Sequence, residues 1–98
     1  MSATIGIARV TLHFEETFSL KDKRSEVKSV TSKLRNQFNA AVAEIEDLDD
    51  MRVATIGIAV LSTSGPHANQ MLSTIISRLE QLLDTSTLAD LHTELIPM

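Results

Sequence analysis

Basic side chains are concentrated in one short part of the chain. Residues 19–38 contain six basic and two acidic side chains, so this segment carries a net charge of +4, whereas the whole chain carries −4. At 100° per residue most of these basic residues share one flank of a helix, and a helix N-terminus adds partial positive charge beside them. Such a surface suits phosphate groups, although a solvated helix face has the same composition. The expected phosphate contacts are Lys21, Lys23, Arg24, Lys28 and Arg35.

A second polar set alternates along two segments near the ends of the chain. Its members are Arg9, Thr11 and His13 in the first segment and Asp90, His92 and Glu94 in the second. Histidine and carboxylate side chains are common zinc ligands and acid–base catalysts. However, neither His-x-x-x-His nor His-Glu-x-x-His spacing occurs, and a cross-strand ion pair of Arg9 with Asp90 or Glu94 accounts for the same residues. We therefore predict an ion pair here and no metal ligand.

The remaining reactive groups lack the partners that catalysis requires. The chain has no cysteine, which excludes disulfides, thiol nucleophiles and thiolate-bound metals. Its glycines are isolated, so the sequence contains no glycine-rich phosphate-binding motif. Ser62, Ser64 and His67 lie close in sequence, but no third member of a catalytic triad accompanies them. We expect a protein that is not an enzyme and that carries no cofactor.

The elements that position these residues begin with a strand and a helix. Over residues 4–14, Val10, Leu12 and Phe14 alternate with polar residues, which predicts a strand. After Ser19, a segment without glycine or proline has apolar residues at helical spacing, which predicts a helix over residues 20–38. The expected core face of this helix comprises Leu20, Val27, Val30, Leu34 and Phe38.

The second half of the chain predicts two more strands, a helix and a final strand. Residues 40–45 and 52–61 are the two strands, joined by an acidic turn that lacks the glycine and the distant glutamate of a calcium loop. A loop at residues 62–66 precedes an apolar stripe that predicts a helix over residues 66–83. Residues 88–96 alternate as the last strand, and Pro97 is expected to end it.

This order of elements predicts an α+β protein with βαββαβ topology. Both helices should cover one face of a four-stranded antiparallel sheet, in the ferredoxin-like arrangement, and right-handed crossovers give the strand order 4-1-3-2. We expect a single domain over residues 1–98, because the length leaves no room for a second one. The sequence has no run of about 18 apolar residues to span a membrane, and the lack of cysteine suits a cytoplasmic protein.

Three segments resemble the YlxP-like family of bacterial proteins. They are Ser19-Leu20-Lys21-Asp22-Lys23-Arg24, Val42-Ala43-Glu44 and Ala54-Thr55-Ile56-Gly57-Ile58-Ala59. The resemblance covers nearly the whole chain and implies a ferredoxin-like fold. No activity is established for the family, but its genes often lie beside those for translation initiation and ribosome maturation, which implies a ribosomal context. Many members carry a tryptophan before the third strand, and this chain carries none.

Two functional hypotheses from different classes remain open. The first is a non-catalytic module that binds structured RNA or ribosomal particles through the phosphate contacts named above. The second is a homodimeric protein-interaction or small-ligand regulatory module that uses the open face of the sheet, where a monomer would expose apolar side chains. The residues expected at that interface are Ile5, Ile7, Val42, Leu61, Leu88 and Ile96.

Overall fold

The computed structural model describes residues 3–16 and 19–98, and this part of the chain forms four strands and two helices. The elements are β1 (Thr4–Phe14), α1 (Leu20–Gln37), β2 (Ala41–Glu46), β3 (Val53–Ser62), α2 (Gly65–Leu82) and β4 (Ser86–Pro97). The predicted order of elements is confirmed, and every boundary except the start of β4 lies within one residue of its predicted position. Neither helix in this part of the chain is long and apolar enough to cross a membrane.

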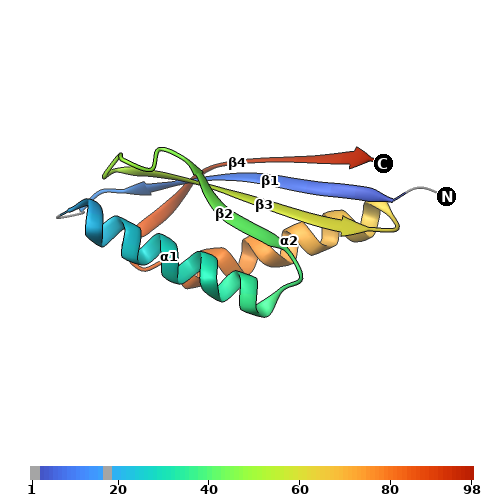
Figure 1. Ribbon diagram of the computed structural model, residues 1–98, viewed down its shortest axis with the longest axis horizontal. Helices are drawn as coiled ribbons and strands as arrows, with labels where there is room; N and C mark the ends of the chain where they lie inside the picture. The colour runs from blue at the N-terminus through green and yellow to red at the C-terminus, as the bar shows by residue number, and fades with distance from the viewer. Residues whose placement is uncertain (1–2, 17–18) are drawn as a thin grey trace.

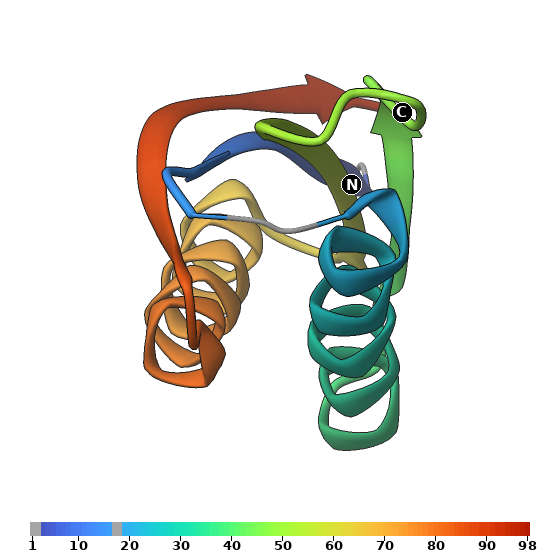
Figure 2. The same cartoon turned by 90° about the vertical axis from the view of Figure 1, so that its left-hand side faces the viewer.

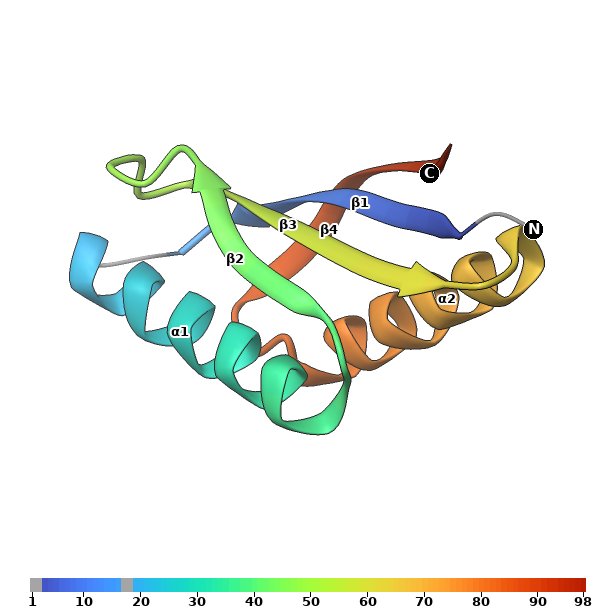
Figure 3. The ribbon, with the colours of Figure 1, turned by 45° about the vertical axis from the view of Figure 1, so that its right-hand side comes forward.

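The strands form one antiparallel sheet in the order β2-β3-β1-β4, which is β4-β1-β3-β2 when read from the other edge. Both helices cover the same face of this sheet, and they diverge from each other beneath it (Figures 1 and 2). The edge strand β2 lies above α1 (Figure 3). The arrangement is therefore α+β and ferredoxin-like, with one sheet face covered and the other open.

Alternate residues of the two central strands face the helices and form the core. Val10 of β1 pairs with Ile56 of β3, and both are fully buried. The helices add their apolar stripes to this layer, and each large side chain that becomes fully buried contributes roughly 1.5–3 kcal/mol. The large apolar side chains of the helices that are fully or nearly fully buried are Val27, Val30, Leu34, Leu72, Ile75 and Leu79. The predicted core face of α1 is confirmed in its centre.

Serine side chains fix the points at which both helices begin. Ser19 Oγ accepts a hydrogen bond from the amide of Asp22 at 3.1 Å, and Ser64 Oγ accepts one from the amide of His67 at 3.2 Å. Each bond satisfies an amide that the first helical turn leaves without a partner. The Ser19 cap sets the phase of α1 and so places Lys23 beneath the turn between β2 and β3.

The placement of Val42 on the open face is wrong. Val42 is only 4% exposed and pairs with Ile58 on the helix face. Its neighbours Ala41 and Ala43 occupy the open face instead. The core gains more from burying valine than from burying alanine, because the hydrophobic contribution grows with the apolar area removed from water.

The placement of Leu88 on the open face is also wrong. In β4 the residue Ala89 is inserted between the pairs Leu12–Leu88 and Thr11–Asp90. This β-bulge changes which residues face the helices, since every side chain beyond an inserted residue points to the other side. Leu88 therefore packs against the core rather than beside the open-face residues of β4.

The structure extends β4 through Pro97, which was expected to end it. Pro97 pairs with Thr4 at the edge of the sheet. Proline lacks an amide proton, and an edge strand tolerates this because one side of the strand is not needed for the ladder.

Glu26 of α1 holds the loop that joins α2 to β4. Its carboxylate accepts hydrogen bonds from the amides of Asp84, Thr85 and Ser86, with the Thr85 bond at 2.9 Å, and from the hydroxyls of Thr85 and Ser86. Burial by itself raises the pKa of Glu26, but the hydrogen bonds from Ser86, Thr85 and Asp84 outweigh it and lower that pKa below its ordinary value.

This lowered pKa predicts a loss of stability in acid. A carboxyl group whose pKa is lower in the folded state binds protons more weakly there than in the unfolded chain. The contribution of Glu26 to the free energy of unfolding is therefore fully present above about pH 4.3, the ordinary pKa of glutamate, and is lost as pH falls through the lowered pKa. Glu26→Gln should be less stable than wild type at neutral pH and should lose less stability on acidification. Urea unfolding at a series of pH values measures this, and parallel curves for the two proteins would contradict it.

Candidate functional site

A buried lysine joins α1 to the turn between β2 and β3. The Lys23 side chain has no exposed surface, although lysine is almost never fully buried without a charge partner. Its Nζ donates to the carbonyl oxygens of Asp47 at 2.6 Å and Val53 at 2.8 Å. It also lies 3.1 Å from Glu44 Oε2, as a charge pair outside hydrogen-bond geometry. The ammonium group is therefore enclosed by the protein itself, which corrects its assignment as a phosphate contact.

The sequence does contain a signal for this buried pair. Lys23 precedes Val27 and Val30 by four and seven residues, so it lies on the core stripe of α1 rather than beside it. Glu44 alternates with Val42 along β2 and therefore faces the same side of the sheet. A lysine and a glutamate at two inward positions together indicate an internal ion pair.

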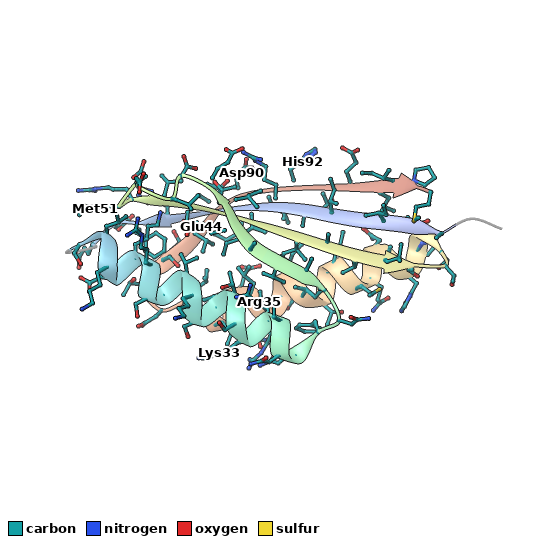
Figure 4. All side chains as sticks on the ribbon, in the orientation of Figure 1. Lys33, Arg35, Glu44, Met51, Asp90 and His92 are labelled. Atoms are coloured by element: carbon teal, nitrogen blue, oxygen red, sulfur yellow. The ribbon has the colours of Figure 1, made fainter. Side chains whose placement is uncertain are left out.

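Arg35 is also engaged within the protein. Its Nη1 donates to the carbonyl oxygen of Val42 at 3.1 Å, and its Nη2 contacts Thr31 Oγ1 at 3.5 Å. Arg35 lies between α1 and β2, whereas Lys33 points away from the sheet (Figure 4). Like Lys23, Arg35 holds the edge strand β2 against α1.

The other predicted phosphate contacts lie on the surface of α1. Lys21 and Lys28 are exposed. Arg24 is exposed too, but its guanidinium forms an ion pair with Asp49 at 3.0 Å. The structure thus brings Lys21, Arg24 and Lys28 to one exposed flank; Arg35 is exposed as well, further along α1, with its guanidinium bonded to the carbonyl oxygen of Val42.

The acidic turn between β2 and β3 is built by its own side chains. Asp47 has a φ of 62°, in the left-handed region that aspartate tolerates better than most residues. Its Oδ2 accepts a hydrogen bond from Thr55 Oγ1 at 2.8 Å. Asp50 Oδ1 accepts one from the amide of Arg52, also at 2.8 Å. These carboxylates shape the turn, a role that the charge pattern alone did not indicate.

Ser62 and His67 meet at the start of α2. Ser62 Oγ lies 2.8 Å from His67 Nδ1 and accepts a hydrogen bond from the amide of Ser64 at 3.2 Å. Together with the Ser64 cap, these bonds fix the sharp connection from β3 to α2. The contact therefore strengthens a helix start, and it supplies no further catalytic partner.

The sheet face opposite the helices carries side chains in rows across the strands. The first row contains Leu61, Ile5 and Ile96. The second contains Ala41, Ala59, Ile7 and Glu94, and the third contains Ala43, Gly57, Arg9 and His92. Neither helix covers this face (Figures 1 and 2). We call it the open face, and the predicted placement of Ile5, Ile7, Leu61 and Ile96 on it agrees with the register.

Small residues in the second and third rows create a hollow of about 530 Å³ in the open face. Alanines and Gly57 form its floor, and Ile7 and Ile45 stand at its sides. Ile45 reaches this position because a β-bulge lies between Glu44 and Glu46, so its side chain lies over Gly57. Lys23 holds Glu44 immediately before this bulge. The buried ion pair therefore positions one side of the hollow.

Charged side chains border the hollow. Arg9 forms an ion pair with Glu46 of β2, so the expected pairing with Asp90 or Glu94 is wrong. The hydrogen bond that the Arg9 guanidinium donates to Glu46 raises the pKa of Arg9, which stays protonated. Asp90 and His92 point away from the helices (Figure 4). Among residues 3–16 and 19–98, no three histidine, aspartate or glutamate side chains converge to hold a metal ion.

Comparison with known proteins places this chain in a family. The family described as protein of unknown function DUF503 matches residues 5–91. The chain belongs to this family. The uncharacterized protein YlxP of Bacillus subtilis is 28% identical to this chain over 76 residues, which cover 78% of this chain and 83% of that protein. The resemblance to YlxP-like proteins is confirmed.

Solved structures resemble this DUF503 protein at low sequence identity. The de novo designed protein Foldit4 aligns with a TM-score of 0.54 at 10% identity and covers 96% of each chain. A dimeric ferredoxin-like protein from an uncultured marine organism aligns with a TM-score of 0.46 at 9% identity, over 100% of this chain and 89% of that chain. The span matched by the DUF503 family includes both members of the Lys23–Glu44 pair and every residue that lines the hollow except His92.

Proposed function

We propose that the protein is a non-catalytic interaction module that forms a homodimer by packing its open face against that of a second copy. The observation that carries this proposal is the apolar hollow of about 530 Å³ on a sheet face that neither helix covers. Leu61, at one end of the same face, is 60% exposed. An apolar surface of this kind is typical of a protein–protein interface.

The open face has the area that a dimer needs. β1 contains 11 residues and the sheet four strands. At ~3.4 Å per residue and ~4.8 Å per strand, this corresponds to roughly 700 Å² per copy. Standard protein–protein interfaces bury about 800 Å² per partner. Interfaces of this size range from micromolar to picomolar affinity, and charged side chains border the apolar part of this face, so we expect a dissociation constant at the micromolar end.

The variant Ile7→Glu tests this proposal, because Ile7 lies in the middle row of the open face and outside the core. A glutamate there would lose its water on association, and we expect a folded monomer. Leu48→Glu is the matched control, since Leu48 is 49% exposed in the turn between β2 and β3. Light scattering after size exclusion gives the mass, and circular dichroism reports the fold. A dimer that survives Ile7→Glu but dissociates with Leu48→Glu would contradict the proposal.

Binding of structured RNA or ribosomal particles is a second proposal. The observation in its favour is that Lys21, Arg24 and Lys28 share an exposed flank of α1 beside its N-terminus, and phosphate contacts need no more than accessible cations. An electrophoretic mobility shift with ribosomal RNA tests it. The double variant Arg24→Glu, Lys28→Glu should then lose binding, whereas Lys33→Glu should retain it.

A further inference from the structure

The open face has an exposed apolar side chain at one end and the hollow further along the strands. Leu61, which is 60% exposed, stands in the first row. Gly57 and Ala43 lie in the third row at the floor of the hollow, and the side chain of Ile45 covers Gly57 and forms one wall of the hollow. Successive rows are about 7 Å apart, because each is two residues along a strand. The second row, with Ile7 and Ala59, lies midway between the first and third rows.

We infer that, in the homodimer proposed above and on which this inference rests, Leu61 of each copy enters the hollow of the other and packs against Ile45, beside Ala43 and Gly57. A two-fold axis that runs across the strands through the second row exchanges the first and third rows. Leu61 of each copy then faces the part of the third row of the other copy that holds the hollow, so the same contact forms at both ends of the interface. Such an isologous contact uses the same patch on both copies and closes at two.

The same axis determines the other contacts. Ile5 of one copy lies over the aliphatic part of Arg9 of the second copy, since both residues belong to β1 and their rows are exchanged. Ile7 lies next to the axis and faces its own equivalent. We therefore expect Ile7→Glu to weaken the dimer strongly, because it would place two carboxylates opposite each other.

The charged residues of the open face are compatible with this arrangement. Arg9 keeps its own carboxylate partner, Glu46, so its charge is not left unpaired when water is removed. Glu94 lies in the axis row, but it is on the edge strand β4, and its side chain is 56% exposed. It therefore belongs to the rim of the interface, where water screens the charge. The centre of the contact is aliphatic.

Complementary variants test the contact between Leu61 and the hollow of the second copy directly. Leu61→Ala removes the side chain that enters the hollow, and Ala43→Leu fills the hollow beside Gly57. Either variant alone should dissociate at least tenfold more easily than wild type, because each homodimer loses two contacts. A mixture of the two should associate again, since the intact Leu61 of one chain meets the open hollow of the other, and the filled hollow meets the missing side chain.

The measurement is fluorescence anisotropy of labelled Leu61→Ala protein titrated with unlabelled Ala43→Leu protein, and with itself. Leu48→Ala is the matched control and should associate like wild type. Self-association of both variants at wild-type strength, or a mixture no tighter than the separate variants, would overturn the inference. If Ile7→Glu is nevertheless monomeric in that case, the open face remains the interface in another register. If wild-type protein is itself monomeric, the proposed homodimer and this inference both fail.

Discussion

Lys23→Met is expected to lower the free energy of unfolding by about 3–5 kcal/mol, the usual cost of removing one member of a buried ion pair. The substitution keeps most of the volume and the helical propensity of lysine, so packing changes little. It leaves the Glu44 carboxylate, whose side chain is only 15% exposed, without its cation. It also leaves the carbonyl groups of Asp47 and Val53 without their buried donor. Urea unfolding measures the change.

A double-variant cycle separates these contributions. Glu44→Leu in the Lys23→Met background removes the stranded carboxylate and should recover part of the loss, but not all of it, because the two carbonyl groups still lack a donor. Lys21→Met is the control on the same helix and should change stability by less than about 0.5 kcal/mol, since Lys21 is exposed. Equal effects of Lys23→Met and Lys21→Met would show that the buried lysine does not hold the turn.

Gly6→Ala is expected to destabilise the fold by about 1–3 kcal/mol, the usual cost of adding a methyl group to a filled core. A Cβ at this position would lie 3.0 Å from Val60 Cγ2 and 3.1 Å from Leu72 Cδ1, and both neighbours are buried. Close approach of α2 to β1 therefore requires glycine here. Thermal or urea unfolding of the variant measures the cost.

Gly57→Ala is the matched comparison, because its Cβ would also lie 3.0 Å from a neighbouring side chain, that of Ile45. Ile45 is 47% exposed and can rotate into solvent, so we expect a change of less than about 0.5 kcal/mol. Comparable losses from Gly6→Ala and Gly57→Ala would show that the open face is packed as tightly as the core.

Alternation and helical spacing were sufficient to predict the fold. Val10, Leu12 and Phe14 alternate into the core as expected, and Ser19 caps α1 at the predicted residue. Both patterns are local consequences of burying one face of an element, so a single sequence reveals them. The same reasoning placed Ile5 and Ile7 on the open face.

Irregular pairing limited what the sequence could predict about the site. Leu88 was misplaced because one bulge residue, Ala89, reverses the alternation of β4, and no local pattern marks that insertion. The bulge in β2 likewise brings Ile45 over Gly57, which creates one side of the hollow. Whether a sheet surface is hollowed depends on which residues pair across neighbouring strands. That register is set by the tertiary structure.

The charge pattern predicted a basic surface but not its use. Counting Lys23 among exposed cations gave too much weight to net charge and too little to its position on the core stripe. Its partner Glu44 lies 21 residues further along the chain, so only the fold brings the two together. The segments that resemble the YlxP-like family contain both residues, and the ion pair gives a structural reason for that combination.

Sedimentation equilibrium of the wild-type protein tests the central claim most directly. The chain has a mass of 10.8 kDa. Between ~1 and ~100 µM, a range that brackets a micromolar dissociation constant, the weight-average mass should rise from near that of one chain to near twice that value. A mass that stays at one chain over the whole range would contradict the assignment of the open face as a dimer interface.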